Sequence, residues 1–570
     1  MHFWGVSYDL SIFFSLTCCA LLCNIALFPI GKHNMFIRKK PNPSGSTSVL
    51  LVRGERIAGK KHSVSRIVKN FGSTDNDVAL QALIQQAETY KANIEAISPK
   101  ARVLKLVSDL DINSCRSYNT GFSDIYGTMF DKVLSGLNVS ASLKDKLRNL
   151  LTMRIAAPAS KLKTSKLALE YNINLNVDTI YKSMDQITSA VIDDAKKIIY
   201  EHTKQLLVKQ KITTDVLFYD LTTLYFETSN PNELCDFGFS KDGKHQHVQI
   251  MLAVIVTKDG LPIDYKEFPG NCYEGHTLIP VLNSLEERFN IDNVVLVADA
   301  ALMNNINLKE LDQRSIKYII AARIKNADKE TKSTILETDS YEIIKTITNN
   351  DGSKDQIKAK VIDLKEDQLV AYHCSKRARK DEHDRDKALE KIKKYIHSSA
   401  KNRLTGSLRK PYVKITKSSK IGIDLDKFNK EKQYDGFFGL RTNIKQPNPI
   451  ELLSSYHGLW QVEQTFRIAK TNLEIRPVFH YTPDRIKAHI LICYMALALV
   501  RYVEFTLKIN DHHIPYEQLH LLLSRMWRVR ITDSNKMLFE ITEDPPPELI
   551  PVYKALKINW PNKFNNIATL

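Results

Sequence analysis

The sequence lacks the short motifs that bind nucleotides, dinucleotides or catalytic zinc. It has no Walker A loop, no dinucleotide-binding glycine fingerprint and no His-Glu-x-x-His motif. Cysteine is scarce as well: five of the eight cysteines stand far apart, and none forms a Cys-x-x-Cys pair. This usage indicates buried thiols in a reducing compartment and argues against a disulfide framework or a zinc site. No internal repeat and no low-complexity tract is found in the 570 residues.

Acidic residues are too few to balance the basic ones. The chain has 81 Lys and Arg against 64 Asp and Glu, which gives a net charge of +17. A surplus of this size favours a polyanionic partner, because each neutralised phosphate releases counterions. A basic bias of the whole genome, or an effect on solubility, is the alternative. The hydrophobic share of 43% and the charged share of 25% are ordinary for a folded protein.

The N-terminal segment 11–30 carries no charged residue and is just long enough to cross a bilayer. The residues before it include no Lys or Arg, and Met35 opens a different sequence in which apolar and polar residues alternate around glycines. We therefore expect translation to begin at Met35, with residues 1–34 outside the working fold. A membrane anchor or signal sequence is the alternative.

Deletion of residues 1–34 tests this interpretation. Protein begun at Met35 is expected to keep its activity and to gain solubility, since a lone apolar segment in water promotes aggregation. Activity assays and sedimentation of both forms provide the measurement. Loss of folding on deletion, or native protein that stays with membranes through salt extraction, would contradict it.

From residue 35 to about 210 the pattern changes from strands to helices. Residues 35–72 read as a small β-module, and 73–210 as a mainly helical, DNA-binding region. Within it, Ser160–Ile187 reads as a helix, an Asn-rich break and a second helix led by Asn176. The pattern predicts either a helix-turn-helix that reads DNA or a plain packing pair.

Beyond residue 210, strand-like runs alternate with helices. The runs 215–220, 247–257 and 261–268 predict a meander, and 293–299 and 317–321 alternate with helices. Together they predict a mixed α/β sheet covered by helices. A polar insertion follows, and its charged helix 376–396 is expected to present a solvated face. The very apolar stretch 488–500 is expected to be a buried core helix, because it is too short to span a membrane.

Three acids are the candidate chemical residues. Asp220 and Asp299 each close an apolar strand, and Glu463 lies on an amphipathic stretch with Arg467 and Lys470 one and two turns later. Carboxylates gathered around one point repel unless cations neutralise them. In a strongly basic chain the three acids predict a Mg²⁺ site that acts on nucleic-acid phosphates.

Each acid also has a simpler interpretation. Asp220 and Asp299 are each suited to cap a following turn or helix. Glu463 is suited to pair with Arg467, four residues on along an exposed helix. For any one acid, the simpler interpretation is at least as good as metal binding. The prediction of a Mg²⁺ site therefore depends on the three acids acting together.

At these residues the sequence resembles the DDE transposases of bacterial insertion sequences, in the subgroup with a Tyr-x2-Arg-x3-Glu-x6-Lys signature. Tyr456, Glu463 and Lys470 match that spacing, whereas Leu459 occupies the Arg position and Arg467 is the candidate substitute. The stretches FYDLTTLYFE, GFSKDGK, VVLVADAAL and LWQVEQTFRIAKTNLEIRPVFH are typical of the subgroup, as is the opening MFIRKKPN.

The resemblance covers residues 35 to about 540 and implies a ribonuclease-H-like catalytic core interrupted by a β-rich insertion. It makes Asp220, Asp299 and Glu463 a metal-binding triad for two Mg²⁺ ions, with Mn²⁺ as an alternative. Trp460 would stack on a displaced base, with a buried anchor of its helix as the alternative. The implied DNA-binding residues are Tyr456, Trp460, Arg467 and Lys470.

The implied activity is cleavage of double-stranded DNA at inverted-repeat ends and joining of the 3′-hydroxyl ends to target DNA, by a homodimer in the cytoplasm beside the nucleoid. A transposon-derived protein that binds DNA without cutting it is the alternative, disfavoured because all three acids are present. The expected divisions are 1–34 (apolar extension), 35–72 (β-module), 73–210 (helical region), 211–325 (first part of the core), 326–435 (insertion), 436–510 (second part of the core) and 511–570 (C-terminal helical region).

Overall fold

The structure is a computed structural model. It describes residues 35–43, 45–55, 64–96, 110–212, 216–228, 230–240, 243–288, 294–302, 304–349, 351–396, 412–415, 421–533, 538–562 and 564–567. The apolar segment 11–30 lies outside the described residues. The chain divides into two units: a large unit of Phe122–Ala168 and Ile173–His520, and a small unit that holds the described residues before and after these together with Leu169–Asn172.

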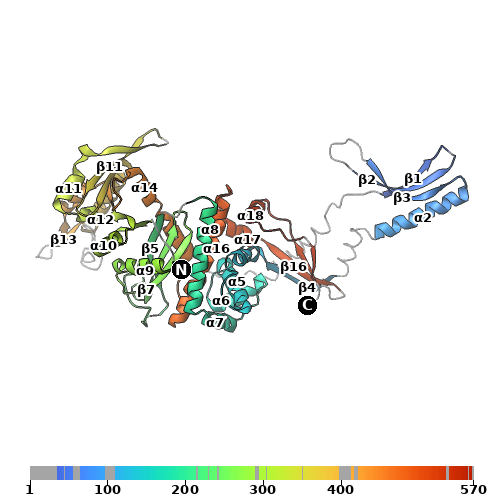
Figure 1. The fold of residues 1–570 in the computed structure, drawn as a ribbon, viewed down its shortest axis with the longest axis horizontal. Coiled ribbons are helices and arrows are strands. Elements are labelled where there is room, and N and C mark those ends of the chain that lie inside the picture. The colour runs from blue at the N-terminus through green and yellow to red at the C-terminus, as the bar shows by residue number, and fades with distance from the viewer. Residues whose placement is uncertain are drawn as a thin grey trace. The chain divides into compact units, whose positions relative to one another are not determined.

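A three-stranded antiparallel sheet covered by one helix forms the first part of the small unit (Figure 1). Strand β2 lies in the centre, and its residues 49–52 are buried. Tyr90 of the helix lies near Phe71, and the Lys69 ammonium is 4.0 Å from the centroid of the Tyr90 ring. The elements are β1 (Met35–Pro41), β2 (Thr47–Glu55), β3 (Val64–Thr74) and α2 (Asp77–Ala96).

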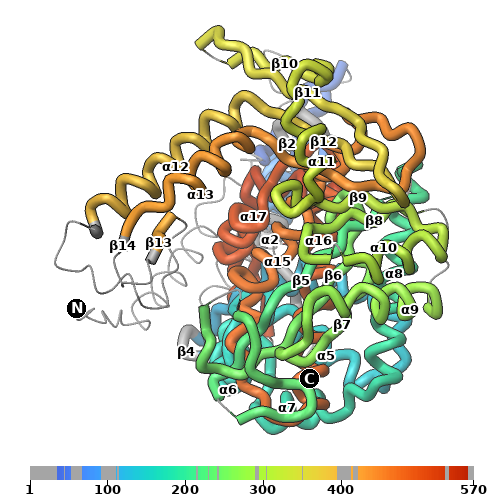
Figure 2. The backbone as a smooth tube through the Cα atoms, turned by 90° about the vertical axis from the view of Figure 1, so that its left-hand side faces the viewer, coloured from blue at the N-terminus to red at the C-terminus, as the bar shows by residue number. Residues whose placement is uncertain are grey.

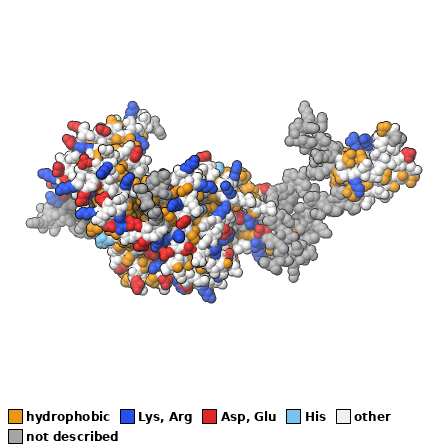
Figure 3. All heavy atoms as spheres, viewed as in Figure 1, with side chains coloured by type: hydrophobic (Ala, Val, Ile, Leu, Met, Phe, Trp, Pro, Cys, Tyr) orange, Lys and Arg blue, Asp and Glu red, His pale blue; other side chains and the backbone are white. Residues whose placement is uncertain are grey.

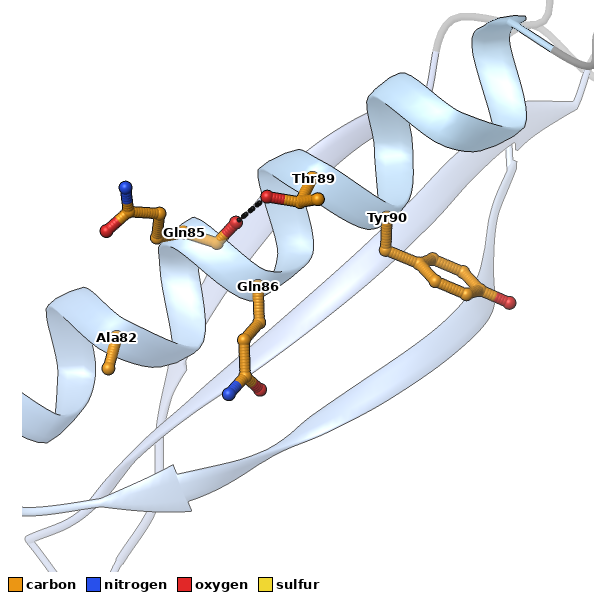
Figure 4. A pocket seen from close by; sticks show the side chains of 5 residues that line it. All are labelled: Ala82, Gln85, Gln86, Thr89 and Tyr90. Carbon is orange, nitrogen blue, oxygen red and sulfur yellow. Dashed lines mark hydrogen bonds between the residues drawn. The ribbon is translucent and has the colours of Figure 1, made fainter.

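A shallow pocket of about 400 Å³ runs along α2 (Figure 4). Its lining is mostly polar and uncharged, and the Thr89 hydroxyl donates to the backbone carbonyl of Gln85 at 2.9 Å. The lining residues are Ala82, Gln85, Gln86, Thr89 and Tyr90.

A four-stranded antiparallel sheet forms the second part of the small unit and corrects two expectations. Strand β4 lies in the region expected to be mainly helical, and three strands lie in the region 511–570 that was also expected to be helical. The sequence WRVRITD of β16 alternates polar and apolar residues, and its Val529 and Ile531 are fully buried. The order is β18 (Phe564–Ile567), β17 (Leu538–Thr542), β16 (Trp527–Asp533) and β4 (Leu110–Asn119).

A nine-stranded mixed sheet is the centre of the large unit. β5, β6 and β7 form an antiparallel meander, while β8 is parallel to β5 and β9 is parallel to β8. The mixed sheet predicted from the strand-like runs is therefore confirmed. The order is β10 (Glu342–Thr348), β11 (Lys354–Asp363), β12 (Gln368–Cys374), β15 (Phe437–Thr442), β9 (Lys317–Ala322), β8 (Val295–Ala298), β5 (Val216–Tyr225), β6 (Gln249–Thr257) and β7 (Pro262–Pro269).

Residues 326–435, expected to be an insertion, add strands to this same sheet. β10, β11 and β12 continue it in antiparallel pairing, and β12 joins β15, which pairs with β9. Helices α12 and α13 lie side by side (Figure 2), where the Arg385 guanidinium is 5.1 Å from the centroid of the Phe428 ring. The other elements here are α11 (Lys329–Leu336), α12 (Ser375–Ile396), β13 (Val413–Ile415), β14 (Ile421–Ile423) and α13 (Leu425–Lys432).

The two faces of the β5–β9 region are covered by different helices. Alternate side chains of β5, among them Leu217, Tyr219 and Leu221, pack in one apolar core with α9 (Leu278–Arg288) and α10 (Asn305–Gln313). Successive strand residues point to opposite faces. Phe218 and Asp220 therefore point to the other face, against which α14 (Pro449–His457) and α15 (Trp460–Arg467) pack.

Helix α16 (Pro483–Lys508) confirms the predicted buried core helix. Among the described residues it is the one helix long and apolar enough to cross a membrane, and 89% of its most apolar 18-residue window is buried inside the protein. Its burial is the mark of a core helix. Of the five dispersed cysteines, Cys235 and Cys493 are buried free thiols, as expected, and Cys272 and Cys374 are partly exposed free thiols.

The helical part of the large unit contains the predicted helix pair. Ser160 caps the first helix by accepting from the Lys163 N–H, and Asn176 caps the second by accepting from the Thr179 N–H. The second helix packs on α5 and α16. DNA reading by this pair stays a prediction. The helices are η1 (Ser123–Gly127), α4 (Thr128–Val133), α5 (Ala141–Ala156), α6 (Lys161–Leu167), α7 (Val177–Asp185) and α8 (Ser189–Lys209).

A buried ion pair fastens α8 to strand β7. The Lys196 ammonium lies 3.2 Å from the Asp264 carboxylate and donates to the Tyr265 carbonyl at 2.6 Å, and both charged side chains are almost fully buried. Removal of Lys196 leaves the buried Asp264 carboxylate with Arg288, 3.7 Å away, as its remaining cationic partner. Lys196→Met is therefore expected to lower the free energy of unfolding by about 3 kcal/mol in urea denaturation, the low end for a broken buried pair. The exposed neighbour Lys197→Met is the control, and equal midpoints for the two variants would contradict the prediction.

Candidate active site

Asp220 and Asp299 lie next to each other on neighbouring parallel strands. The register pairs Phe218 of β5 with Val297 of β8, and each acid comes two residues later on its strand. Adjacent strands are about 4.8 Å apart. The two carboxylates therefore start from neighbouring backbone positions on the face covered by α14 and α15. Asp299 follows β8 directly, as predicted, but Asp220 lies inside β5, which continues to Tyr225 because residues 221–225 pair with β6.

A glycine allows the helix that carries Glu463 to lie close against this face. The amphipathic stretch around Glu463 consists of α14, α15 and a π-helical turn, η8 (Ile468–Asn472). At Gly458, between α14 and α15, a Cβ atom would lie 2.5 Å from the Phe218 ring. A larger residue there would push the helix away from β5. On the far side, Arg501 donates to the Gln461 side chain at 3.0 Å and to the Gly260 carbonyl at 2.9 Å.

All three acids act on one phenol, that of Tyr456 near the end of α14. Burial, then the negative charges of Asp299 and Glu463, and also that of Asp220, raise the pKa of Tyr456 above its ordinary value. A nearby negative charge disfavours the phenolate and so raises the pKa. The structure thus brings the three predicted acids and Tyr456 into one neighbourhood, although Glu463 is 243 residues from Asp220 in sequence.

Local backbone groups hold the two aspartates. An Asp220 oxygen accepts from the Leu221 N–H at 2.7 Å, and an Asp299 oxygen accepts from the Ala301 N–H at 2.8 Å. Asp299 therefore caps the turn that follows it, as the simpler interpretation predicted. Its negative charge still acts on Tyr456. Within the described ranges no group of three His, Cys, Asp or Glu side chains is already arranged to hold a metal ion. The donors are oxygen-only, which is the chemistry that a hard cation such as Mg²⁺ takes.

The other predicted residues lie on both sides of Glu463 along the same segment. Glu463 and Arg467 are exposed, and among the described ion pairs none joins them, so the simpler role of Glu463 is not seen. Trp460 is 53% exposed, which excludes the buried-anchor alternative. Leu459, at the position where the resemblance expects Arg, is buried. Arg467 follows Glu463 by four residues within α15, which places it on the same side of that helix, whereas Lys470 lies in the π-helical turn η8 that follows.

The stretch that contains all of these residues matches a family model. Residues 213–499, slightly more than half of the chain, match the family described as the transposase DDE domain. The chain belongs to this transposase family. The comparison with curated proteins gives no match.

Two solved transposase structures show a distant similarity to the chain. One is the piggyBac transposase in a synaptic complex with hairpin DNA, at 9% identity and a TM-score of 0.35 over 70% of this chain and 76% of that one. The other is the Mos1 transposase in a paired-end complex with the left transposon end, at 11% identity and a TM-score of 0.15 over 30% of this chain and 57% of that one.

Arg377 is a charged residue near Tyr456 that the sequence did not single out. It lies on α12, the charged helix expected to be a solvated face, with its guanidinium 5.1 Å from the centroid of the Phe438 ring. Its positive charge lowers the pKa of Tyr456, against the effect of the three acids. The Arg377 side chain also pairs with Asp381 at 3.5 Å. In sequence it is one of many basic residues on a polar helix, and no local signal distinguishes it.

Proposed function

We propose that the protein is a transposase that cuts DNA at the inverted-repeat ends of an insertion sequence and joins the 3′-hydroxyl ends to target DNA by Mg²⁺-dependent phosphoryl transfer. Asp220, Asp299 and Glu463 are the metal-binding acids of this proposal. The observation that carries it is the position of Asp220 and Asp299 side by side at β5 and β8, with α15, which carries Glu463, packed against β5. The strand order β7-β6-β5-β8-β9, with two acids at its centre, supports a ribonuclease-H-like core.

In this proposal each group of side chains has one task at the phosphate that is cut. Two Mg²⁺ ions, or Mn²⁺, would when bound activate the attacking oxygen and stabilise the leaving one. Asp220 and Asp299 present oxygen donors from a rigid sheet, and Glu463 presents a third from α15. Arg467 and Lys470 hold phosphates beside the cut.

The reaction consists of two successive displacements at phosphorus. In cleavage, a water oxygen bonds to phosphorus while the bond to the 3′-oxygen breaks, and that oxygen leaves with a proton. In joining, this 3′-hydroxyl oxygen attacks a phosphate of the target strand, whose own 3′-oxygen departs. Such transfers need positioning and charge more than covalent chemistry from the protein. Trp460, exposed one turn before Glu463, would stack on a displaced base.

A reconstituted cleavage reaction tests the proposal. Protein begun at Met35 is incubated with duplex DNA of its own flanking inverted repeats and Mg²⁺, and nicked and joined products are separated on denaturing gels. Both products are expected with Mg²⁺, and neither with a chelator. Specific binding of the ends with no cleavage would favour the alternative, a transposon-derived protein that binds DNA without cutting it. A homodimer in the synaptic complex and a cytoplasmic location belong to the same proposal.

Arg467→Gln and Lys470→Gln should each slow cleavage about tenfold to a hundredfold while lowering affinity for the ends much less. Each would remove a charge-assisted contact to one phosphate near the cut, while the many other phosphate contacts remain. Cleavage rates at saturating DNA, together with separate binding titrations, give the two quantities. Lys508→Gln is the control, because Lys508 lies at the end of α16 and pairs with Asp259 at 3.1 Å. Equal losses of rate and affinity would assign the two residues to general binding.

A further inference from the structure

A second pocket lies in the large unit, beyond the acids, at the far end of strand β5. Its volume is about 440 Å³. One wall is the chain that leaves β5 at Phe226, and the other is the segment that ends at Tyr481. Phe226 pairs with Val478 in a parallel bridge, and the Asn232 side chain donates to the Tyr481 carbonyl at 3.2 Å. The two walls are therefore fixed to each other by backbone contacts.

The lining suits a flat, uncharged aromatic ring. Phe226 and His480 are buried in the wall, and Tyr481 stands 63% exposed beside them. Burial, with Lys161 and Arg154 nearby, lowers the pKa of His480 to about 3, so its imidazole is neutral at physiological pH. Glu227 also lines the pocket and is exposed, which makes the pocket unfavourable for a phosphate.

The same lining offers hydrogen-bond acceptors for an amino group. Glu227 supplies a carboxylate, and Asn230, also exposed in the lining, supplies an amide oxygen. Carboxylates accept from the exocyclic amino group of cytosine, and amides bond to adenine. An aromatic wall with such acceptors has the chemistry that recognises a nucleobase.

Two positively charged side chains lie just outside the pocket, next to the ring of Tyr225. The Lys244 ammonium lies 5.4 Å from the centroid of the Tyr225 ring, and the Arg476 guanidinium lies 5.7 Å from it. Tyr225 directly precedes Phe226 of the pocket wall. A base in the pocket would therefore have its sugar–phosphate chain beside two cations, which is the combination found in proteins that bind single strands.

The distance from the acids is set by the strand itself. Tyr225 is five residues beyond Asp220 on β5, and at about 3.3 Å per residue this is about 17 Å. The same length holds about five base-pair steps of duplex DNA. The pocket is therefore remote from the cut phosphate, and a group bound there belongs to another nucleotide of the same DNA.

We propose that this pocket binds one unpaired base of the DNA end, about five base-pair steps from the cut. Tyr481 stacks on the base, Glu227 and Asn230 accept from its amino group, and Lys244 and Arg476 hold the flanking phosphates. The inference rests on the proposed function, which identifies the bound DNA as the inverted-repeat end. It adds to that function a site that selects which base of the end is unpaired.

The test uses fluorescence, so that it needs no cleavage. Full-length Asp220→Ala protein is mixed with end duplexes that carry 2-aminopurine at one position at a time, across the first ten positions from the cut. One position, about five steps from the cut, is expected to change its emission on binding, because a base that leaves the helix changes its stacking. Adding Tyr481→Ala should abolish that change and lower affinity for the end about tenfold. Tyr273→Ala is the matched control, since Tyr273 is 56% exposed and does not line the pocket.

Glu227→Gln gives a second test, whose result does not depend on whether the Tyr481→Ala protein folds. It should weaken binding about fivefold to ends with cytosine or adenine at the responsive position and leave ends with thymine unchanged. The inference is overturned if the end binds and no position responds, or if Tyr481→Ala and Tyr273→Ala behave alike. Failure of the protein to bind any end duplex would instead overturn the proposed function, and the inference with it.

Discussion

Replacement of any one of the three acids is expected to abolish DNA cleavage. Asp220→Ala, Asp299→Ala and Glu463→Gln should each lower the cleavage rate at least about a thousandfold, because a lost metal ligand removes about 4 kcal/mol or more of transition-state stabilisation. Affinity for the DNA ends should change little, because these side chains hold cations and not DNA. The measurements are single-turnover cleavage with Mg²⁺ and a separate binding titration with a chelator present.

Glu451→Gln is the control for these variants. Glu451 is an exposed carboxylate on α14, near the helix N-terminus and beside Asn448 at 3.3 Å, so it shares the helix of Tyr456 without joining the acids. It should cleave at the normal rate. Substantial cleavage by one of the three acid variants would remove that residue from the site, whereas loss in the control as well would indicate that α14 tolerates no change.

Affinity for duplex ends should fall steeply as salt is added. If six to ten phosphates are neutralised, the association constant drops about 10³-fold to 10⁵-fold between 50 and 200 mM salt. The net charge of +17 makes a large phosphate count plausible. On the face drawn in Figure 3 the Lys and Arg side chains are interspersed with Asp and Glu and form no single basic patch. On this face, contacts to phosphates would therefore come from separate residues, and the salt dependence should be a property of many residues.

Single substitutions sharpen the salt experiment. Each phosphate contact that is removed should reduce the slope of log affinity against log salt by about one. Arg467→Gln is expected to show this reduction, and Lys508→Gln, whose side chain pairs with Asp259, is expected to keep the full slope. A flat response of the unmutated protein would exclude nucleic acid as its partner.

The local sequence pattern predicted which strands and helices the large unit contains better than it predicted where each of them ends. Alternation and apolar runs located strands β5 to β9, because these periods reflect burial on the two faces of a sheet. The end of β5 was placed too early, since Asp220 reads as a strand terminator, yet Leu221 to Tyr225 go on pairing with β6. The amphipathic stretch around Glu463 is interrupted at Gly458, where a Cβ atom would meet the Phe218 ring of a distant strand, and no local pattern shows that contact.

Long-range contacts explain the rest of the differences. The proximity of Glu463 to the two aspartates is set by how α15 packs, and the sequence suggested it chiefly through the family resemblance. Arg377 was overlooked because its helix is rich in charged residues, and only the structure shows Phe438 next to it. The strands at the C-terminal end were missed because short alternating runs between helices carry a weak signal, and the partner of β16 is on the other side of the sequence.

That pairing of β16 with β4 has a consequence for synthesis of the protein. Roughly 400 residues separate Asn119 from its partner Trp527, and at about 5–20 residues per second a ribosome takes about 20–80 seconds to make them. For that time β4 exists with an unpaired edge, which is a template for pairing with other chains. Copies that terminate early through a frameshift would keep this open edge permanently. We expect such shortened copies to accumulate as aggregates or to be degraded, so that DNA copies with late stop codons would produce little soluble protein to compete with the intact chain.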